Sequence, residues 1–148
     1  GFVGLAGSTH LPPDGAWWNA RRTGDARGFV FQGDNPETMT PNYFGKPGQV
    51  VVLDGCFLAI TYANLKKIGL DQPKYLETGW DFYDIHLTYK SHLQGFSNYV
   101  VPIITMHESP GIMREGWFAA KDKFLRHHAA TLPYSKLPTD KTHGLPKQ

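Results

Sequence analysis

The chain of 148 residues is long enough for one domain with its own hydrophobic core and too short for two. A composition of 41% hydrophobic and 19% charged residues excludes a disordered or fibrous protein. A net charge of +2 without a run of like charges gives no indication of nucleic-acid binding, and a single cysteine excludes an intrachain disulfide and a cysteine zinc cluster.

The first half of the chain is predicted to form short strands separated by loops. Apolar or β-branched runs predict strands at residues 2–6, 28–32, 50–53 and 56–60. Gly- and Pro-rich segments predict loops at residues 8–28, 33–48 and 70–79. A loop as long as 33–48 is uncommon in a small domain unless it is a lid or a binding loop, so we expect it to close over a site.

The second half is predicted to be mainly helical. Helical spacing of apolar residues predicts helices at residues 62–68, 82–94 and 117–128. Thr61 is the expected N-cap of the first of these, and Gly69 is its expected left-handed C-terminal residue. The apolar run at 99–106 predicts a strand, which Pro102 restricts to a sheet edge.

Strands that alternate with helices predict an α/β fold. We expect one domain at residues 1–130, followed by a Pro- and Lys-rich tail at residues 131–148. The chain opens on Gly1 with an apolar run and without a methionine, so we expect it to be a piece of a longer protein.

Cysteine usage and hydropathy bear on the compartment. Cys56, the one cysteine, favours a reducing compartment. No apolar run reaches the ~18 residues of a membrane-spanning helix. We therefore expect a cytoplasmic protein with no transmembrane segment, or one attached peripherally to a membrane.

The segment Trp80–Leu87, WDFYDIHL, places two carboxylates at the start of a predicted helix. Asp81 stands at the expected N-cap and Asp84 three residues later. In one interpretation the two aspartates do no more than cap the helix. The same geometry also suits a catalytic carboxylate, held rigidly beside Tyr83, that accepts a proton from a substrate hydroxyl. The two interpretations can apply to different aspartates.

Three further motifs have both a structural and a functional interpretation. Asp54-Gly55 interrupts an apolar strand. The pair is either a turn or bulge, or a carboxylate at a strand end beside a glycine that lets a ligand approach. His107 ends a predicted strand, where it is either a surface residue or a metal or phosphate contact. Trp17-Trp18 can be core aromatics, or platforms for a sugar ring.

Six segments in chain order resemble the C-terminal half of family 2-like glycosyltransferases of the GT-A type. They are GLAGS at 4–8, the Trp17-Trp18 pair, VLDGCFLAI at 52–60, FYDIHL at 82–87, Gly95, and HESPG at 107–111. The resemblance covers about residues 2–125. It implies a partial GT-A fold, a mixed sheet flanked by helices, from which the N-terminal nucleotide-binding half is absent.

The resemblance also implies roles for individual residues. Asp84 matches the general base that deprotonates the acceptor hydroxyl, and Tyr83 stands where an acid usually precedes it. Asp54 and Gly55 match the acceptor-side "DG" pair. His107 matches a histidine that completes the metal or diphosphate site in several GT-A enzymes. Trp17, Trp18 and Trp80 would then stack on sugar faces, and Asp81 would cap the helix.

A complete enzyme of this type is expected to use Mn²⁺ or Mg²⁺, held by a D-x-D motif. No D-x-D motif occurs in this chain, so His107 alone would be too few ligands for either ion.

The leading hypothesis is therefore transfer of a sugar from a nucleotide-diphospho-sugar donor to a glycan or other hydroxyl acceptor, with inversion. The alternative is a non-catalytic carbohydrate-binding or scaffold protein, or an inactive fragment, that lacks the donor site. Because the missing half would pair with residues 2–6, we also expect an exposed sheet edge there and a homo-oligomer formed through it.

Overall fold

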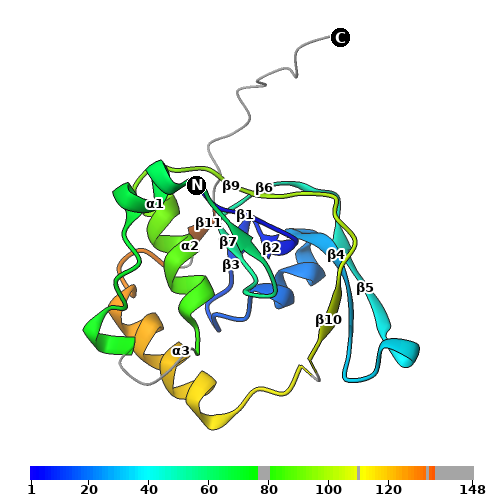
Figure 1. Ribbon diagram of the computed structural model, residues 1–148. Helices are drawn as coiled ribbons and strands as arrows, with labels where there is room; N and C mark the ends of the chain where they lie inside the picture. The colour runs from blue at the N-terminus through cyan, green and yellow to red at the C-terminus, as the bar shows by residue number, and fades with distance from the viewer. Residues whose placement is uncertain (77–80, 110, 133, 136–148) are drawn as a thin grey trace, which may run out of the picture.

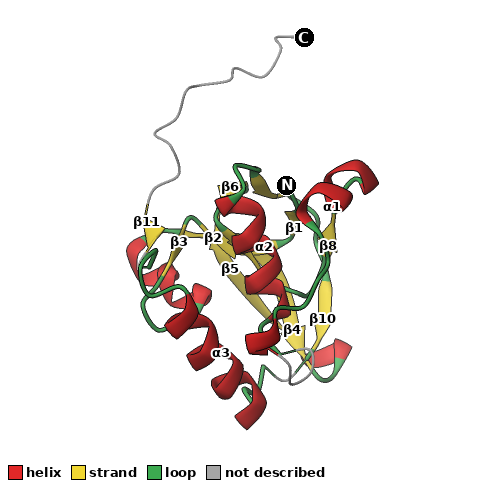
Figure 2. Ribbon diagram, turned by 90° about the vertical axis from the view of Figure 1, so that its left-hand side faces the viewer, coloured by secondary structure: helices red, strands yellow, loops and turns green. Residues whose placement is uncertain are grey.

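The computed structural model describes residues 1–76, 81–109, 111–132 and 134–135. It is a mixed α/β fold, which confirms the predicted class. Figure 1 shows the path of the chain, and Figure 2 shows helices α2 (Tyr83–Leu93) and α3 (Glu115–His127) together in front of the strands. Within the described ranges, none of the helices has both the length and the apolar character that crossing a bilayer requires.

The remaining elements are short. The strands are β1 (Val3–Gly4), β2 (Ala6–Ser8), β3 (His10–Leu11), β4 (Ala26–Gly33), β5 (Thr40–Gly45), β6 (Gly48–Val50), β7 (Val52–Leu53), β8 (Leu58–Ala59), β9 (Asn98–Val100), β10 (Met106–Glu108) and β11 (Tyr134–Ser135). The other helices are α1 (Tyr62–Ile68) and the 3-10 helices η1 (Trp17–Thr23), η2 (Pro36–Thr38) and η3 (Lys74–Leu76). Strands β3 and β11 pair with each other.

Two larger sheets are built from the same segments of the chain, because consecutive strands of a segment belong to different sheets. One has the strand order β6-β9-β1-β8; the other has the order β10-β4-β2-β7, with β5 also paired to β4. The chain passes from the first sheet to the second between β1 and β2 at Leu5, between β6 and β7 at Val51, and again between β9 and β10. Leu5 and Val51 are buried in the core. The single mixed sheet that we expected is therefore two sheets joined by continuous backbone.

The helix predicted at residues 62–68 is confirmed as α1, with the same bounds. The Asn64 N–H donates to Thr61 Oγ1 at 3.4 Å, and Gly69 has φ of 78° at the end of the helix. Local capping signals were sufficient to predict this element.

The expected exposed edge at residues 2–6 is wrong. Strand β1 lies between β8 and β9, and strand β2 lies between β4 and β7. Both edges of these strands are hydrogen-bonded within the chain, so the reason for expecting a homo-oligomer at this edge is lost.

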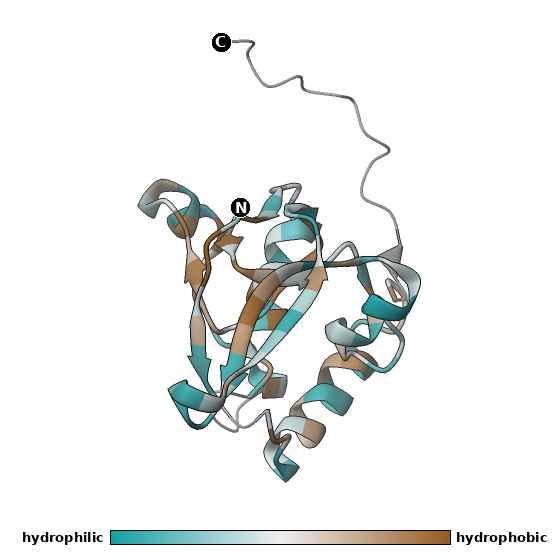
Figure 3. Ribbon diagram, turned by 90° about the vertical axis from the view of Figure 1, so that its right-hand side faces the viewer, coloured by the Kyte–Doolittle hydropathy of each residue, from teal (hydrophilic) through white to brown (hydrophobic). Residues whose placement is uncertain are grey.

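The loop predicted at residues 33–48 is also wrong over most of its length. Strands β4 and β5 form an antiparallel hairpin in which Val30 lies opposite Asn42, and η2 forms its tip. Pro41 is tolerated because β5 pairs on one side only. A paired hairpin therefore takes the place of the expected lid (Figures 1 and 3).

The strand predicted at residues 99–106 divides into β9 and β10, which belong to different sheets. Strand β9 pairs in parallel with β1, and β10 pairs in parallel with β4. Pro102 lies in the connection between them. The apolar run is therefore a crossing between two sheets. Strand β10 is at the end of its sheet, but Pro102 precedes it and lies in neither strand.

The buried side chain of Asn98 connects four parts of the fold. Its Oδ1 accepts hydrogen bonds from the Phe2 N–H and the Ser91 hydroxyl, both at 2.9 Å. Its Nδ2 donates to the carbonyls of Val51 and Thr88 at 2.9 and 2.8 Å. These four bonds satisfy the whole amide group. One side chain thus joins β9 to the start of the chain, to the β6–β7 crossing and to α2.

We expect Asn98→Leu to lower the free energy of unfolding by about 3–5 kcal/mol, because it leaves several buried backbone groups without partners. Urea denaturation followed by tryptophan fluorescence measures this change. Asn35→Ala is the control: Asn35 is exposed and caps only η2, so its loss should cost about 1 kcal/mol or less. Equal costs for the two variants would contradict the assigned role of Asn98.

Candidate active site

The chain between β7 and β8 loops out of the sheet and carries Asp54 and Gly55. The Asp54 N–H donates to the Ala6 carbonyl at 2.9 Å, and Leu58 pairs with Gly4. The residues between Asp54 and Leu58 are therefore opposite a single residue of the partner strand, which is a bulge. The turn or bulge interpretation of Asp54-Gly55 is thus confirmed, and the bulge presents both residues beside the start of α2.

Helix α2 begins at Tyr83, immediately after a residue in a strained conformation. Phe82 has φ of 65°, and it is the only residue other than glycine with positive φ among those that the structure describes. A bulky residue in this region costs about 1–3 kcal/mol and usually indicates a functional constraint. Phe82 is buried and contacts the rings of Trp117 and Phe124 on α3, with centroids 5.4 and 5.1 Å away.

The predicted role of Asp81 as the N-cap of this helix is wrong. Phe82 occupies the N-cap position, and no side chain caps the helix. The Asp81 carboxylate instead lies against Gly116, in the first turn of α3, where a β-carbon would collide with it. The positive end of the α3 dipole favours a carboxylate at this position.

Asp84 is fixed by backbone donors from two elements. Its Oδ2 accepts from the Gly55 N–H and its Oδ1 from the Ile85 N–H, both at 2.8 Å. The Tyr83 hydroxyl donates to the Gly55 carbonyl at 3.2 Å. A side chain at residue 55 would meet this hydroxyl, so the glycine permits the bulge to approach α2. The predicted pairs Asp54-Gly55 and Tyr83-Asp84 are therefore brought into direct contact.

Trp17 holds the second carboxylate of the site. Its indole N–H donates to Asp54 Oδ2 at 3.2 Å, and the Cys56 N–H donates to Asp54 Oδ1 at 2.9 Å. Trp17 is only 3% exposed, because its ring packs against Trp18 and Phe44. It has almost no free ring face, which contradicts the expectation that Trp17 stacks on a sugar.

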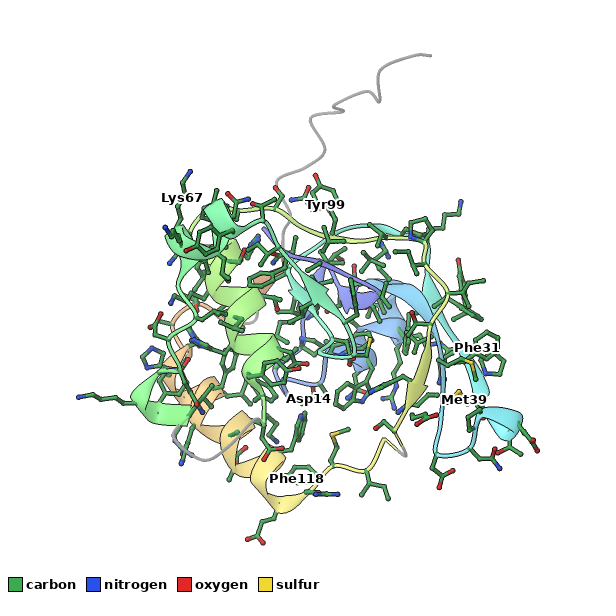
Figure 4. The ribbon with its side chains drawn as sticks, in the orientation of Figure 1. Asp14, Phe31, Met39, Lys67, Tyr99 and Phe118 are labelled. Carbon is green, nitrogen blue, oxygen red and sulfur yellow. The ribbon has the colours of Figure 1, made fainter. Side chains whose placement is uncertain are left out.

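Two cavities that share several lining residues open here, and their lining includes residues of β10 and α3. Figure 4 shows the side chains that lie between these two elements. We call the first, of about 510 Å³, the acidic lobe; it is lined by Asp54, Gly55, Asp81, Tyr83, Asp84, Arg114 and Trp117, among others. We call the second, of about 380 Å³, the hairpin lobe; it is lined by Arg21, Val30, Gln32, Asn42 and Phe44, among others. The wall that lines both is formed by Trp17, Trp18, Asp54, His107, Ser109 and Met113.

The two carboxylates of the acidic lobe differ in environment. Burial, and after it the neighbouring charge of Asp54, raises the pKa of Asp84 from 3.8 to about 7, although its two backbone donors act in the opposite direction. Burial and the same carboxylates raise the pKa of the Tyr83 hydroxyl, which stays protonated. A carboxyl group that titrates near neutral pH can accept and return a proton under ordinary conditions.

A family model described as "Glycosyltransferase like family" matches residues 1–132. The chain belongs to this family. Searches of curated proteins and of solved structures return no significant match. Membership assigns this glycosyltransferase-like chain to glycosyl transfer in general, with a sugar donor and an acceptor as its partners.

The described part of this glycosyltransferase-like chain does not form a metal site by itself. No group of three or more His, Cys, Asp or Glu side chains in it is arranged to hold an ion. His107 lines both lobes. The described residues by themselves therefore do not supply enough ligands for the Mn²⁺ or Mg²⁺ that the resemblance implies for a complete enzyme, and no step below depends on it.

The sequence analysis missed several residues that line the cavities of this glycosyltransferase-like chain, and one predicted site residue has no described position. Arg114 and Trp117 line the acidic lobe, but neither stands in a recognisable motif. Asn42 lies in the segment that was predicted to be a loop. Trp80 lies outside the described residues. His86, two positions after Asp84, is on another side of α2, where its Nδ1 is 2.9 Å from the Tyr75 hydroxyl.

The pKa of Asp84 can be measured directly by ¹³C NMR titration of its carboxyl carbon. We expect a value near 7, and a lower value in Asp54→Asn, because that change removes a negative charge beside the carboxylate. The control Asp34→Asn, at an exposed position of the β4–β5 hairpin, should leave the titration unchanged. An unchanged or raised pKa in Asp54→Asn would show that the two carboxylates do not interact.

Proposed function

We propose that this chain carries the acceptor-side catalytic centre of a glycosyltransferase, and that Asp84 is its general base. The observation that supports the proposal is a carboxylate with a raised pKa, fixed by two backbone donors at the edge of an open cavity. Few structural roles require a carboxylate in such an environment, whereas proton transfer at neutral pH does. Its neighbours Asp54 and Tyr83 complete a polar site suited to hydroxyl groups.

In the proposed reaction, Asp84 accepts the proton of an acceptor hydroxyl in the acidic lobe. The acceptor oxygen then forms a bond to the anomeric carbon of a nucleotide-diphospho-sugar, and the bond from that carbon to the phosphate oxygen breaks. The nucleoside diphosphate leaves with the electron pair, and the configuration at the anomeric carbon is inverted. Charge develops as at other glycosidic centres, through an oxocarbenium-like transition state.

One positive group of the acidic lobe suits the leaving diphosphate. Arg114 is exposed at the rim, directly before the N-terminus of α3. Its guanidinium can bind phosphate oxygens in a bidentate manner. His107 on the shared wall is a further hydrogen-bond partner for the donor, which is the part of its predicted role that does not require a metal ion.

Asp84→Asn in the full-length protein should lower the transfer rate about 10²–10⁴-fold, because it removes the proton acceptor. The dissociation constant for the nucleotide-sugar should change less than about twofold, since the variant keeps the shape of the cavity. Rates are measured by release of nucleoside diphosphate, and binding is measured by calorimetry with UDP- and GDP-sugars.

The control for this experiment is Asp122→Asn, which changes an exposed carboxylate on α3 and should leave the rate unchanged. Retention of more than about a tenth of the original rate in Asp84→Asn would exclude Asp84 as the base. Binding of glycans without binding of any nucleotide-sugar would favour the non-catalytic carbohydrate-binding alternative.

The pH dependence of transfer should report the same carboxylate. Because only the ionised form of Asp84 accepts a proton, kcat/KM should fall as the pH decreases through about 7. In Asp54→Asn this acidic limb should move to lower pH, because the pKa of Asp84 is no longer raised by a neighbouring charge. If the acidic limb stays at the same pH in Asp54→Asn, the limb belongs to a group other than Asp84.

A further inference from the structure

The hairpin lobe has a lining that the proposed reaction does not use. Asp84 and Tyr83 line only the acidic lobe, so the reacting hydroxyl does not lie in the hairpin lobe. The two lobes nevertheless share a wall that includes Asp54 and His107. A ligand whose reacting group is in the acidic lobe can therefore extend along this wall into the second cavity.

The polar groups of the hairpin lobe come from one face of a paired sheet. In the parallel register of β10 and β4, His107 lies beside Gln32, and in the hairpin Asn42 lies opposite Val30. Residues that alternate along a strand point to the same face, so Gln32 and Val30 share the cavity face with His107 and Asn42. A row of polar side chains thus leads from the shared wall into the hairpin lobe, on a scaffold of three strands.

Aromatic side chains form the rest of this lobe. Phe44 and Trp18 are only partly buried, in contrast to Trp17. The Arg21 guanidinium lies 6.0 Å from the centre of the Phe44 ring. Partly exposed rings offer apolar surface to the C–H faces of a sugar, and amide side chains both donate to and accept from its hydroxyl groups.

The charges of the hairpin lobe are balanced. Its lining includes one full positive charge, Arg21, and one carboxylate, Asp54. Arg114, the positive group that we assign to the leaving diphosphate, lines only the acidic lobe. The hairpin lobe therefore suits an uncharged ligand that is rich in hydroxyl groups.

We propose that the hairpin lobe binds a second sugar unit of the acceptor, so that the acceptor is a glycan of at least two units lying across both lobes. This inference rests on the proposed function, because it places the reacting hydroxyl beside Asp84. Gln32 and Asn42 hold the hydroxyl groups of the second unit, and Phe44 and Trp18 contact its ring. The β4–β5 hairpin thereby selects for acceptor length.

The test is an NMR titration of the ¹⁵N-labelled protein with matched saccharides: glucose with cellobiose and maltose, N-acetylglucosamine with chitobiose, and mannose with α-1,2-mannobiose. At least one disaccharide should shift the side-chain amide signals of Gln32 and Asn42. It should also bind at least about tenfold more tightly than its monosaccharide. Equal affinity within every pair, or no shift of these two signals by any saccharide up to about 50 mM, would overturn the inference.

The variants Gln32→Met and Asn42→Leu keep the volume of the lobe and remove its hydrogen bonds. Each should weaken disaccharide binding about 3- to 10-fold and leave monosaccharide binding unchanged. Asn35→Ala, an exposed asparagine of the same hairpin, is the matched control and should change neither affinity. The spectrum of each variant shows directly whether it is folded. If both variants are folded and both retain the full disaccharide affinity, the inference is contradicted.

These titrations do not depend on transfer, so the two proposals can fail separately. An active Asp84→Asn enzyme together with a Gln32-dependent preference for disaccharides would refute the base and retain the second sugar subsite. An inactive Asp84→Asn enzyme together with no preference for length would retain the base and refute the subsite.

Discussion

The amide of Asn98 is the contact on which the arrangement of this fold most depends. It accepts from the backbone of Phe2 and from Ser91, and it donates to the carbonyls of Val51 and Thr88. These bonds hold β9 and α2 in a fixed position relative to each other. Thr88 continues this connection toward the site, since its hydroxyl accepts from the Leu53 N–H and donates to the Asp84 carbonyl. The position of α2 relative to the sheets is therefore determined by hydrogen bonds as well as by apolar packing.

This rigid frame lets the acidic lobe keep two carboxylates close together. Burial of the Asp84 carboxylate, and after it the charge of Asp54, is unfavourable for the ionised form of Asp84, and both raise its pKa. Backbone donors from Gly55 and Ile85, and the indole of Trp17 on Asp54, offset part of that cost. An arrangement that is unfavourable for stability and is held by the rest of the fold is typical of a functional site.

Local signals in the sequence were enough for some elements and not for others. The cap at Thr61 and the turn at Gly69 predicted α1 correctly, and the pattern around Asp54 and Asp84 identified the residues that meet in the acidic lobe. The β5 strand was missed because its Pro and Gly content resembles a loop, and only its pairing with β4 makes it a strand. The sheet change around Pro102 and the place of Asp81 on α3 also depend on contacts distant in sequence, which local propensity does not encode.

The strained backbone at Phe82 connects the packing of α3 to the orientation of Asp84. An isolated chain would rarely adopt this conformation, so it is maintained by the contacts of the Phe82 ring with Trp117 and Phe124. These rings belong to α3, which follows α2 by more than twenty residues. Asp84 lies two residues after Phe82, so α3 contributes to the site in two ways. Trp117 lines the acidic lobe, and the packing of α3 on Phe82 supports the backbone from which the Asp84 carboxylate reaches the Gly55 N–H.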